Sequence, residues 1–244
     1  MLTSLNNPKV KEWKKLQKRK YRRKNGRFIV EGSHLVEEAL NSDWDVEEII
    51  LREGSSLDLI EGVPATYVSH QVFQEIAETE TPQGMAAIVN YKEFPYRQQD
   101  FSLLIDSVQD PGNLGTLIRT ADAAGFSQVI IGEGSVDPFN EKVLRSTQGS
   151  LFHLPIIQGK LEQYVEAINS EGVPLYAAAL EGAVPYKKFE PKGRAAIIVG
   201  NEGQGIRKEL LDLVDDKVYI PIYGQAESLN VAIAAAILMY HFKG

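Results

Sequence analysis

The sequence predicts an α/β protein with a smaller N-terminal domain and a larger C-terminal one. The chain of 244 residues, of which 43% are hydrophobic and 24% charged, is long enough for two modest globular domains. Short apolar runs typical of strands alternate with amphipathic stretches typical of helices along most of it. A polar segment at 92–100, which contains Pro95 and lacks an apolar period, divides this alternation and is the predicted linker.

The first set of elements lies within residues 21–91 and predicts a small α/β domain. Ser33 is the expected N-cap of its first helix. We expect, in order, a strand at 27–32, a helix at 33–40, strands at 46–53 and 65–69, a helix at 71–78 and a strand at 84–91.

The second set lies within residues 101–244. Its strands are short and continuously apolar and are separated by helices, a pattern that predicts a parallel sheet covered on both faces. We expect strands at 102–106, 128–132, 152–157, 174–180, 195–200 and 217–222, and helices near 114–124, 139–148, 161–170, 206–214 and from 231 onward.

A basic arm, residues 1–20, precedes these domains. Residues 1–27 hold eleven Lys and Arg against one acid, so they carry +10 while the remaining 217 residues carry −17. Val10, Trp13 and Leu16 recur at three-residue spacing, which predicts a helix with one docked apolar edge. Such a cluster suits contact with RNA or DNA, since phosphate neutralisation releases counterions; the alternative is a solvated tail.

Composition excludes several kinds of site. The chain has no cysteine, which rules out disulfides, thiol catalysis and iron–sulfur clusters, and its four histidines are far apart, so no metal site is predicted. No apolar run reaches the roughly 20 residues of a membrane span, and the N-terminus is basic where a signal peptide is apolar. We therefore expect a cytoplasmic protein without a membrane partner.

Three loops of the second domain carry the polar residues of interest, at 106–125, 199–206 and 222–230. In parallel α/β sheets ligands bind at the carboxyl ends of the strands, where these loops lie. On the first loop's helix, Arg119 points away from the apolar stripe that begins at Leu114. Asn113 and Arg119 alone could equally be a turn residue and a surface arginine.

The second and third loops are more informative. Gly200 to Gly205 fits neither G-x-G-x-x-G nor the phosphate loop that requires Lys at Ile206, which argues against a dinucleotide or NTP site. Its glycines allow close approach of a ligand beside Glu202, or form a tight turn with an exposed acid. Ser228 is a good N-cap for the last helix, whereas Asn230 has no obvious structural role there. That helix is apolar all round, so we expect it to be buried in the core or against another subunit.

Taken together and in this order, "PGNLGTLIRTADAAG", "IVGNEGQGI" and "IPIYGQAESLNVAIAAAILMY" closely resemble the three motifs of the SpoU/TrmH branch of the SPOUT RNA methyltransferases. The resemblance covers residues 102–242. Residues 20–91, with "FIVEG", "LVEEAL" and "TETPQG", resemble that group's ribosomal-protein-like substrate-binding domain.

The resemblance implies transfer of a methyl group from S-adenosylmethionine to a ribose 2′-hydroxyl of RNA. It also implies a trefoil-knotted SPOUT domain, although knots are otherwise nearly absent from proteins, and a homodimer whose interface includes the knot region. By position it implies cofactor contacts at Gly200, Ile220 and Leu229. The implied catalytic set is Asn113, Arg119, Glu202, Ser228 and Asn230.

Our hypothesis for Arg119 follows from its chemistry. Its pKa is too high for a general base, so it would grip a neighbouring phosphate and stabilise the developing alkoxide while the other residues orient the groups. A long basic arm with an added recognition domain suggests a large structured target, so by analogy 23S ribosomal RNA is favoured as the substrate over transfer RNA. The alternatives are a tRNA 2′-O-methyltransferase, a non-catalytic RNA-binding or ribosome assembly protein, and an oxidoreductase on a nucleotide fold.

Overall fold

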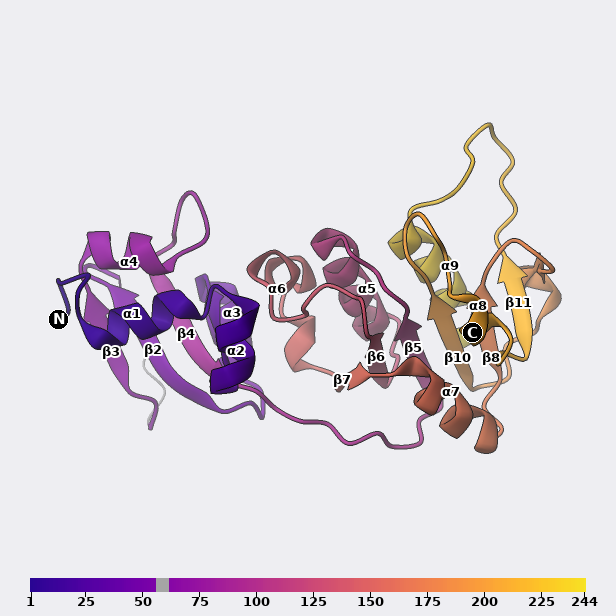
Figure 1. The fold of residues 1–244 in the computed structure, drawn as a ribbon, viewed down its shortest axis with the longest axis horizontal. Coiled ribbons are helices and arrows are strands. Elements are labelled where there is room, and N and C mark those ends of the chain that lie inside the picture. Colours follow the sequence, from indigo (N-terminus) through magenta and orange to yellow (C-terminus); the bar gives the residue numbers. More distant parts are fainter. Residues whose placement is uncertain (56–61) are drawn as a thin grey trace. The chain divides into compact units, whose positions relative to one another are not determined.

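The computed structural model describes residues 1–55 and 62–244. Packing divides the chain into two units (Figure 1). The first comprises Met1–Glu93 together with Asp137–Phe152, and the second comprises Phe94–Val136 together with His153–Gly244. The chain therefore passes between the units three times, and a segment from the middle of the sequence completes the first unit.

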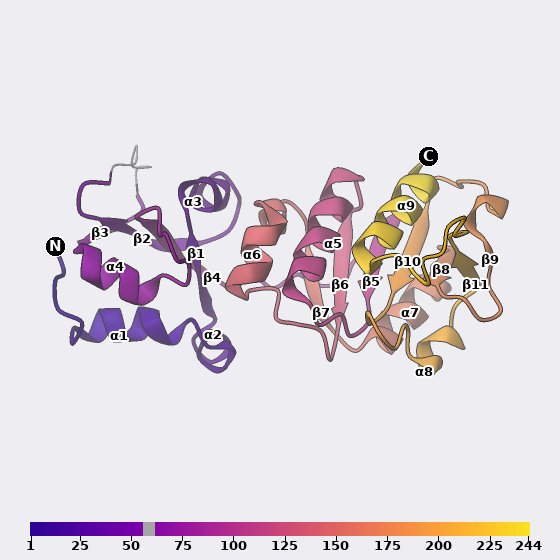
Figure 2. The ribbon, with the colours of Figure 1, turned by 90° about the horizontal axis from the view of Figure 1, so that it is seen from above.

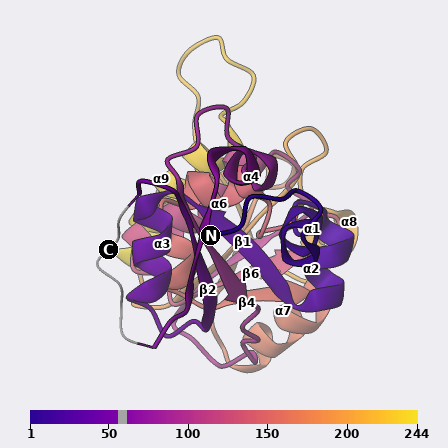
Figure 3. The same cartoon turned by 90° about the vertical axis from the view of Figure 1, so that its left-hand side faces the viewer.

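The first unit is built on a mixed four-stranded sheet. Its elements are α1 (Pro8–Lys15), α2 (Arg19–Asn25), β1 (Arg27–Glu31), α3 (Ser33–Leu40), β2 (Val46–Arg52), β3 (Ala65–Val68), α4 (His70–Ile76), β4 (Met85–Asn90), α6 (Glu141–Thr147) and the 3-10 helix η1 (Ser150–Phe152). The strand order is β1-β4-β2-β3. β4 pairs antiparallel with both β1 and β2, and β2 pairs parallel with β3. Helices α1 and α2 lie on one side of the sheet and α3 lies on the other (Figures 2 and 3).

The N-terminal helix docks as its spacing predicts. Val10, Trp13 and Leu16 are all buried and form one cluster with apolar residues of α4, β2 and β4. Each such side chain contributes about 2 kcal/mol when it is fully buried. The side-chain oxygen of Asn7 caps α1 by accepting a hydrogen bond from the Lys9 amide at 2.9 Å. The arm is thus a folded part of the first unit.

The expected capping role of Ser33 is wrong. Helix α3 begins at Ser33 itself, and the N-cap is Gly32, whose φ is 98°. Only glycine adopts that conformation without strain, so the turn from β1 places the glycine at the cap and the serine one position inside the helix. The Ser33 amide instead donates to Oε1 of Gln83 at 3.1 Å.

Residues 137–152 belong to the first unit through aromatic packing. The rings of Phe28 and Phe139 lie 4.7 Å apart, and those of Trp44 and Phe152 lie 5.6 Å apart. The helix expected at 139–148 is present as α6, and it packs on β1. Its amphipathic pattern specifies a buried face and does not specify which sheet that face covers.

The second unit contains a seven-stranded sheet that is parallel throughout, as predicted. Its elements are β5 (Phe101–Ile105), α5 (Pro111–Ala123), β6 (Gln128–Gly132), β7 (Ile156–Gly159), α7 (Leu161–Ser170), β8 (Leu175–Ala178), β9 (Val184–Pro185), η2 (Tyr186–Lys188), β10 (Ala195–Val199), α8 (Lys208–Leu211), β11 (Asp216–Tyr219) and α9 (Val231–Lys243). The order is β7-β6-β5-β10-β8-β11-β9. Helices α5 and α9 pack side by side, and α7 and α8 lie on the other side of the sheet (Figure 2).

The last crossing of the sheet positions the site. β11 lies two strands beyond β10, yet the next helix, α9, packs against β10 and α5. Residues 220–230 make this return as a long loop that projects from the second unit (Figure 1). The knot implied by the family resemblance would form along this return and stays a prediction.

No helix within the described ranges is long and apolar enough to cross a membrane.

Candidate active site

Three side chains from the three predicted loops meet in one hydrogen-bonded chain. Nδ2 of Asn113 donates to Oε1 of Glu202 at 2.9 Å, and Nδ2 of Asn230 donates to Oδ1 of Asn113 at 2.8 Å. Asn113 lies in the first turn of α5, Glu202 follows β10, and Asn230 immediately precedes α9. The loops therefore converge at the carboxyl ends of β5, β10 and β11, where a parallel sheet binds its ligands.

Glu202 is the centre of this chain. Its carboxylate also accepts hydrogen bonds from the backbone amides of Gln109 at 3.2 Å and Asp110 at 3.1 Å. Partial burial alone would raise the pKa of Glu202, but the hydrogen bonds from Asn113 and from these amides outweigh it and lower that pKa. The carboxylate thus stays charged and holds the start of the first loop against the second.

The second loop is organised by a residue that the sequence reasoning passed over, Asn201. Its Oδ1 accepts from the amides of Gly203 and Gln204, both at 3.0 Å, and its Nδ2 donates to the Ser107 carbonyl at 2.8 Å. Its backbone amide and carbonyl pair with Gly205 at 2.9 Å. An Asn that directly follows a glycine at the end of a strand is a turn signal that could have identified this role.

A buried carboxylate anchors the far end of the same loop. Asp106, which is fully buried at the end of β5, accepts from the Arg207 amide at 2.9 Å and from its Nε at 2.8 Å. Burial is the largest single influence on the pKa of Arg207 and lowers it, but the side-chain hydrogen bond to Asp106 and the negative charges of Asp106 and Glu162 outweigh burial and raise that pKa. The 200–207 segment is therefore tied to the first loop at both of its ends.

Gly200 has a steric reason to be glycine. A Cβ at this position would lie 2.2 Å from the carbonyl carbon of Gly205 and 2.3 Å from the amide nitrogen of Ile206. Both contacts are with backbone, so no side chain can move aside to relieve them. The loop folds back on itself only because residue 200 has no side chain.

A cavity of about 300 Å³ opens beside the hydrogen-bonded chain. This volume is at the lower end of the range for small-molecule sites. Six of the eight residues singled out from the sequence line it, namely Gly200, Glu202, Ile220, Ser228, Leu229 and Asn230. Its inner wall is apolar, with Ala178, Val199 and Leu238 among the lining residues.

The third loop leaves its backbone available to a ligand. Within the described residues, 220–229 form no hydrogen bond to the rest of the chain. Ile220, Ser228 and Leu229 of this segment border the cavity. Backbone donors and acceptors normally find partners, so a segment with free groups beside an apolar cavity suits a polar ligand with an apolar ring.

The predicted N-cap at Ser228 is wrong. Helix α9 begins at Val231, and Oδ1 of Asn230 accepts from the amides of Ala232 at 2.9 Å and Ile233 at 3.3 Å. Asn230 thus has a structural role that the sequence interpretation did not give it, and its Nδ2 remains free to reach Asn113. Ser228 is exposed on the loop and lines the cavity.

Arg119 faces outward from α5, as its position opposite the apolar stripe predicts. Leu114, Leu117 and Ile118 are fully buried, whereas Arg119 is exposed. It lies six residues beyond Asn113, which is about 9 Å along the helix axis. Its side chain makes no hydrogen bond or ion pair with the described residues of its own chain and does not line the cavity.

Helix α9 is only partly covered, although its sequence is apolar all round. Ala235, Leu238 and Met239 are buried, but Ile233 is 51% exposed and Tyr240 is 57% exposed. These two residues, with the half-buried Ile237 between them, form a stripe along the outer side of the helix.

No group of three His, Asp or Glu side chains in the described ranges gathers to hold a metal ion.

The sequence matches two family models that together span most of the chain. Residues 100–240 match the SpoU rRNA Methylase family, and residues 7–87 match the MRM3-like substrate binding domain. The chain is 49% identical over 245 residues to the 23S rRNA (guanosine(2553)-2′-O)-methyltransferase RlmP of Bacillus subtilis, covering 100% of this chain and 99% of that protein.

Solved structures resemble the chain over nearly its whole length. An AdoMet-bound rRNA methyltransferase from Sinorhizobium meliloti aligns with a TM-score of 0.89 and 32% identity, covering 98% of this chain and 95% of that one. The SpoU methyltransferase AviRb from Streptomyces viridochromogenes, in complex with AdoMet, aligns with a TM-score of 0.86 and 28% identity, covering 97% of both chains.

Proposed function

We propose, from the premise that this chain belongs to the SpoU rRNA methylase family, that it transfers a methyl group from S-adenosylmethionine to the 2′-hydroxyl of a guanosine in 23S rRNA. One observation carries the enzymatic part of the proposal. Asn113, Glu202 and Asn230 form one hydrogen-bonded chain at the mouth of a cavity lined by the residues the family resemblance assigns to the cofactor.

The choice of substrate rests on the full-length similarity. The Bacillus subtilis relative is named for guanosine 2553 of 23S rRNA, and its 49% identity extends through both units. The substrate-binding part of the chain is therefore similar as well as the catalytic part. This supports a ribosomal RNA guanosine as the target and a cytoplasmic site of action.

The cavity residues fit S-adenosylmethionine. The apolar wall formed by Ala178, Val199 and Leu238 suits an adenine ring, and the free backbone of residues 220–229 suits its polar edges. Gly200 would let the second loop lie directly against the cofactor, and Ile220 and Leu229 would flank it. When bound, S-adenosylmethionine supplies a methyl group already activated on a sulfonium sulfur.

The protein's own task is to orient a poor nucleophile and to manage one proton. We assign Glu202, Asn113 and Asn230 to a rigid polar rim that positions the ribose hydroxyl. Ser228, exposed on the third loop, is placed to donate to or accept from the same nucleotide. Arg119 would grip a neighbouring phosphate with its planar guanidinium and stabilise the charge that develops on the 2′-oxygen.

Arg119 would perform this task in the cavity of a second copy of the chain. In its own chain it faces outward, about two turns along α5 from Asn113. The exposed stripe of Ile233 and Tyr240 lies on α9, which packs beside α5. A homodimer formed through this stripe would cover the apolar side chains and carry Arg119 to the partner's site.

Mapping 2′-O-methyl groups across ribosomal and transfer RNA, in cells with and without the gene, tests the function. We expect the loss of one mark at a 23S rRNA guanosine. Loss of a transfer RNA mark would overturn the substrate. If no mark changed and calorimetry detected no binding of S-adenosylmethionine, the chain would instead be a non-catalytic RNA-binding protein.

A further inference from the structure

The eleven basic residues of the N-terminal segment divide into two groups with different surroundings. Four of them, Lys9, Lys14, Arg22 and Arg27, form ion pairs within the first unit. The other seven form what we call the outer basic strip, which consists of Lys11, Lys15, Lys18, Arg19, Lys20, Arg23 and Lys24.

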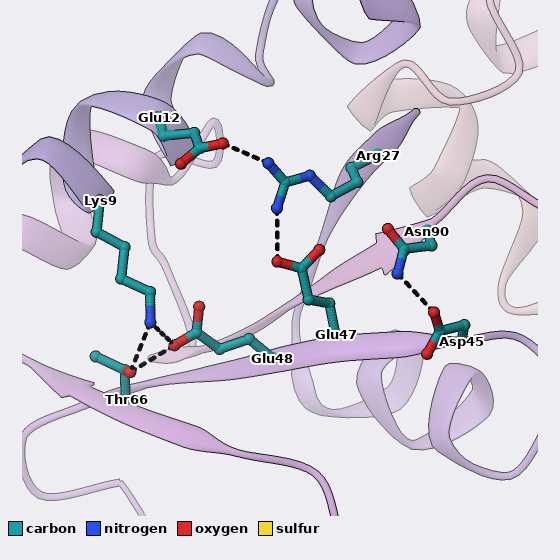
Figure 4. Close-up of polar contacts among 8 residues, drawn as sticks. All are labelled: Lys9, Glu12, Arg27, Asp45, Glu47, Glu48, Thr66 and Asn90. Carbon is teal, nitrogen blue, oxygen red and sulfur yellow. Dashed lines mark hydrogen bonds and ion pairs between the residues drawn. The ribbon is translucent and has the colours of Figure 1, made fainter. Parts of the chain in front are cut away.

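The paired group holds the arm to the sheet (Figure 4). Arg27 on β1 donates to Glu47 at 2.6 Å and also pairs with Glu12 of α1. Lys9 of α1 pairs with Glu48, a buried carboxylate on β2. These contacts join α1 to β1 and β2, so their charges are already neutralised inside the unit.

Arg22 secures α2 in the same way. Its Nη2 lies 2.6 Å from Oδ2 of Asp137, and only 3% of Arg22 and 5% of Asp137 are exposed. Its Nη1 also donates to the carbonyls of Leu16 at 2.9 Å and Gln17 at 2.8 Å. A single buried side chain thus ties α2 both to the end of α1 and to the 137–152 segment.

The outer basic strip has no such partners. All seven side chains are exposed, and none forms an ion pair within residues 1–55 and 62–244. Five of the seven residues of α2 are cationic and none is acidic. On this helix Arg19 lies one turn from Arg23, and Lys20 lies one turn from Lys24.

This arrangement is unfavourable without a counter-charge. Like charges one turn apart destabilise a helix. Lys18, Arg19 and Lys20 also lie at the N-terminal end of α2, where the helix dipole is already positive, and Lys18 makes no side-chain cap. The helix persists because the buried Arg22 holds its middle and the left-handed Gly26 ends it, while its surface remains self-repelling.

We propose that the outer basic strip binds the phosphate backbone of the RNA substrate, an inference that rests on the proposed function. Residues 28–244 carry −17 and repel RNA, so the strip concentrates the attraction at one place. The strip contains no exposed large apolar side chain, as insertion into a membrane or a protein interface would require. Of the aromatic side chains in this stretch, Trp13 is buried and Tyr21 is half-buried, with its ring 5.8 Å from Nζ of Lys15. The exposed groups of the strip are therefore cationic and suit phosphate contacts that position the RNA and do not read its sequence.

A charge-matched pair of variants of the full chain tests the proposal. The first carries Arg19→Gln, Arg23→Gln and Lys24→Gln in the strip. The control carries Lys187→Gln, Lys188→Gln and Lys192→Gln, three exposed lysines of the second unit. Both lose the same net charge. The probe is a transcript of the 23S rRNA region that corresponds to guanosine 2553 of the Bacillus relative, titrated at several KCl concentrations without S-adenosylmethionine.

We expect the strip variant to bind about tenfold more weakly or worse at 150 mM salt. The slope of log K against log salt should fall by about 2, at roughly 0.7 to 0.9 per lost phosphate contact. The control should keep the wild-type slope. In methylation assays the strip variant should show a raised KM with kcat retained at saturating RNA. Its thermal midpoint should match or exceed the wild type, because the change removes repulsion and no ion pair.

An unchanged salt slope in the strip variant would overturn the proposal. So would a variant that binds the naked transcript normally and fails only with assembled ribosomal particles, since the strip would then bind a ribosomal protein. A different result would overturn the proposed function. In that case the wild-type chain would bind the transcript with the expected salt slope but would methylate no 23S rRNA.

Discussion

Nδ2 of Asn113 donates to Oε1 of Glu202 at 2.9 Å although 89 residues separate them in the chain. Asn113 in turn accepts from Asn230 at 2.8 Å, so one amide joins the three loops that surround the cavity. The carboxylate contributes most to this arrangement because it accepts from the Asn113 amide and from two backbone amides at once.

Glu202→Gln should weaken S-adenosylmethionine binding by about tenfold and lower turnover by about a hundredfold. Glutamine keeps the shape but loses the charge, and hydrogen bonds to a charged group are worth about 1.5–3 kcal/mol. Calorimetry and single-turnover methylation would measure the two effects. Glu209→Gln, a change at an exposed acid of α8, is the control and should leave both unchanged. Wild-type behaviour of Glu202→Gln would remove this carboxylate from the site.

The same residue should make the second unit sensitive to acid. The Glu202 pKa is lowered in the folded chain, so its contribution to stability is complete above the ordinary carboxyl pKa of about 4.3. That contribution is lost as the pH falls through the lowered folded value. Urea unfolding from pH 7 to pH 3 should show the wild type and Glu202→Gln converging in stability below about pH 4.3. A stability difference that stayed constant with pH would contradict the assignment.

Arg119→Lys should lose about a hundredfold in turnover, within the range for removal of one positioned donor from a developing oxyanion. Lysine keeps the charge but cannot form the bidentate phosphate contact. Cofactor affinity and thermal midpoint should not change, because Arg119 is exposed and does not line the cavity of its own chain. A Lys variant that kept most of its turnover would show that a point charge suffices.

Mixing Arg119→Ala with Glu202→Gln chains tests where Arg119 acts. If it completes the partner's site, heterodimers regain one intact site although neither homodimer has one. Recovery of up to a quarter of the wild-type activity is expected from an equal statistical mixture. No recovery at all would show that Arg119 and Glu202 of one chain act in the same site.

Ile233→Lys should yield a folded monomer with little methylation activity. Ile233 is 51% exposed, so the substitution is tolerated within one chain, but it would place a charge in the stripe that we assign to the dimer interface. Sedimentation velocity would give the oligomeric state, and circular dichroism would confirm the fold. A wild-type chain that sediments as a monomer would refute the dimer directly.

Asp137→Asn should destabilise the first unit by about 3–5 kcal/mol, because it leaves the buried Arg22 guanidinium without its counter-charge. The double variant Arg22→Met with Asp137→Leu should recover most of this loss, since it removes both charges together. Denaturant unfolding followed by tryptophan fluorescence, which reports on Trp13 and Trp44 in this unit, would measure both. Equal destabilisation by the single and double variants would show that the charges are not coupled.

Much of the fold could be predicted because it follows from local patterns. Buried strands such as Leu103–Ile105 are continuously apolar, and the residues of α5 that face the sheet follow a helical period. These patterns report burial at each position, and they place Arg119 on the outside correctly. The meeting of Asn113, Glu202 and Asn230 also follows once the strands are parallel, because their carboxyl ends share one edge.

Other features depend on contacts between distant segments. The pairing of Arg22 with Asp137 and the packing of Phe139 on Phe28 connect residues more than a hundred positions apart. No periodicity specifies such partners. At Ser228 and Asn230 the error was of a different kind, since both residues are good caps and only the backbone path of the third loop decides which one precedes α9.

The close approach at Gly200 limits how the protein could be redesigned. Residue 200 has no side chain to shorten, and even a methyl group there would overlap the backbone of Gly205, so this position cannot be used to enlarge the cavity for sulfonium donors that carry allyl or propargyl groups. Directed evolution toward such alkylating reagents would have to shorten other side chains that line the cavity, such as Leu180 and Leu229.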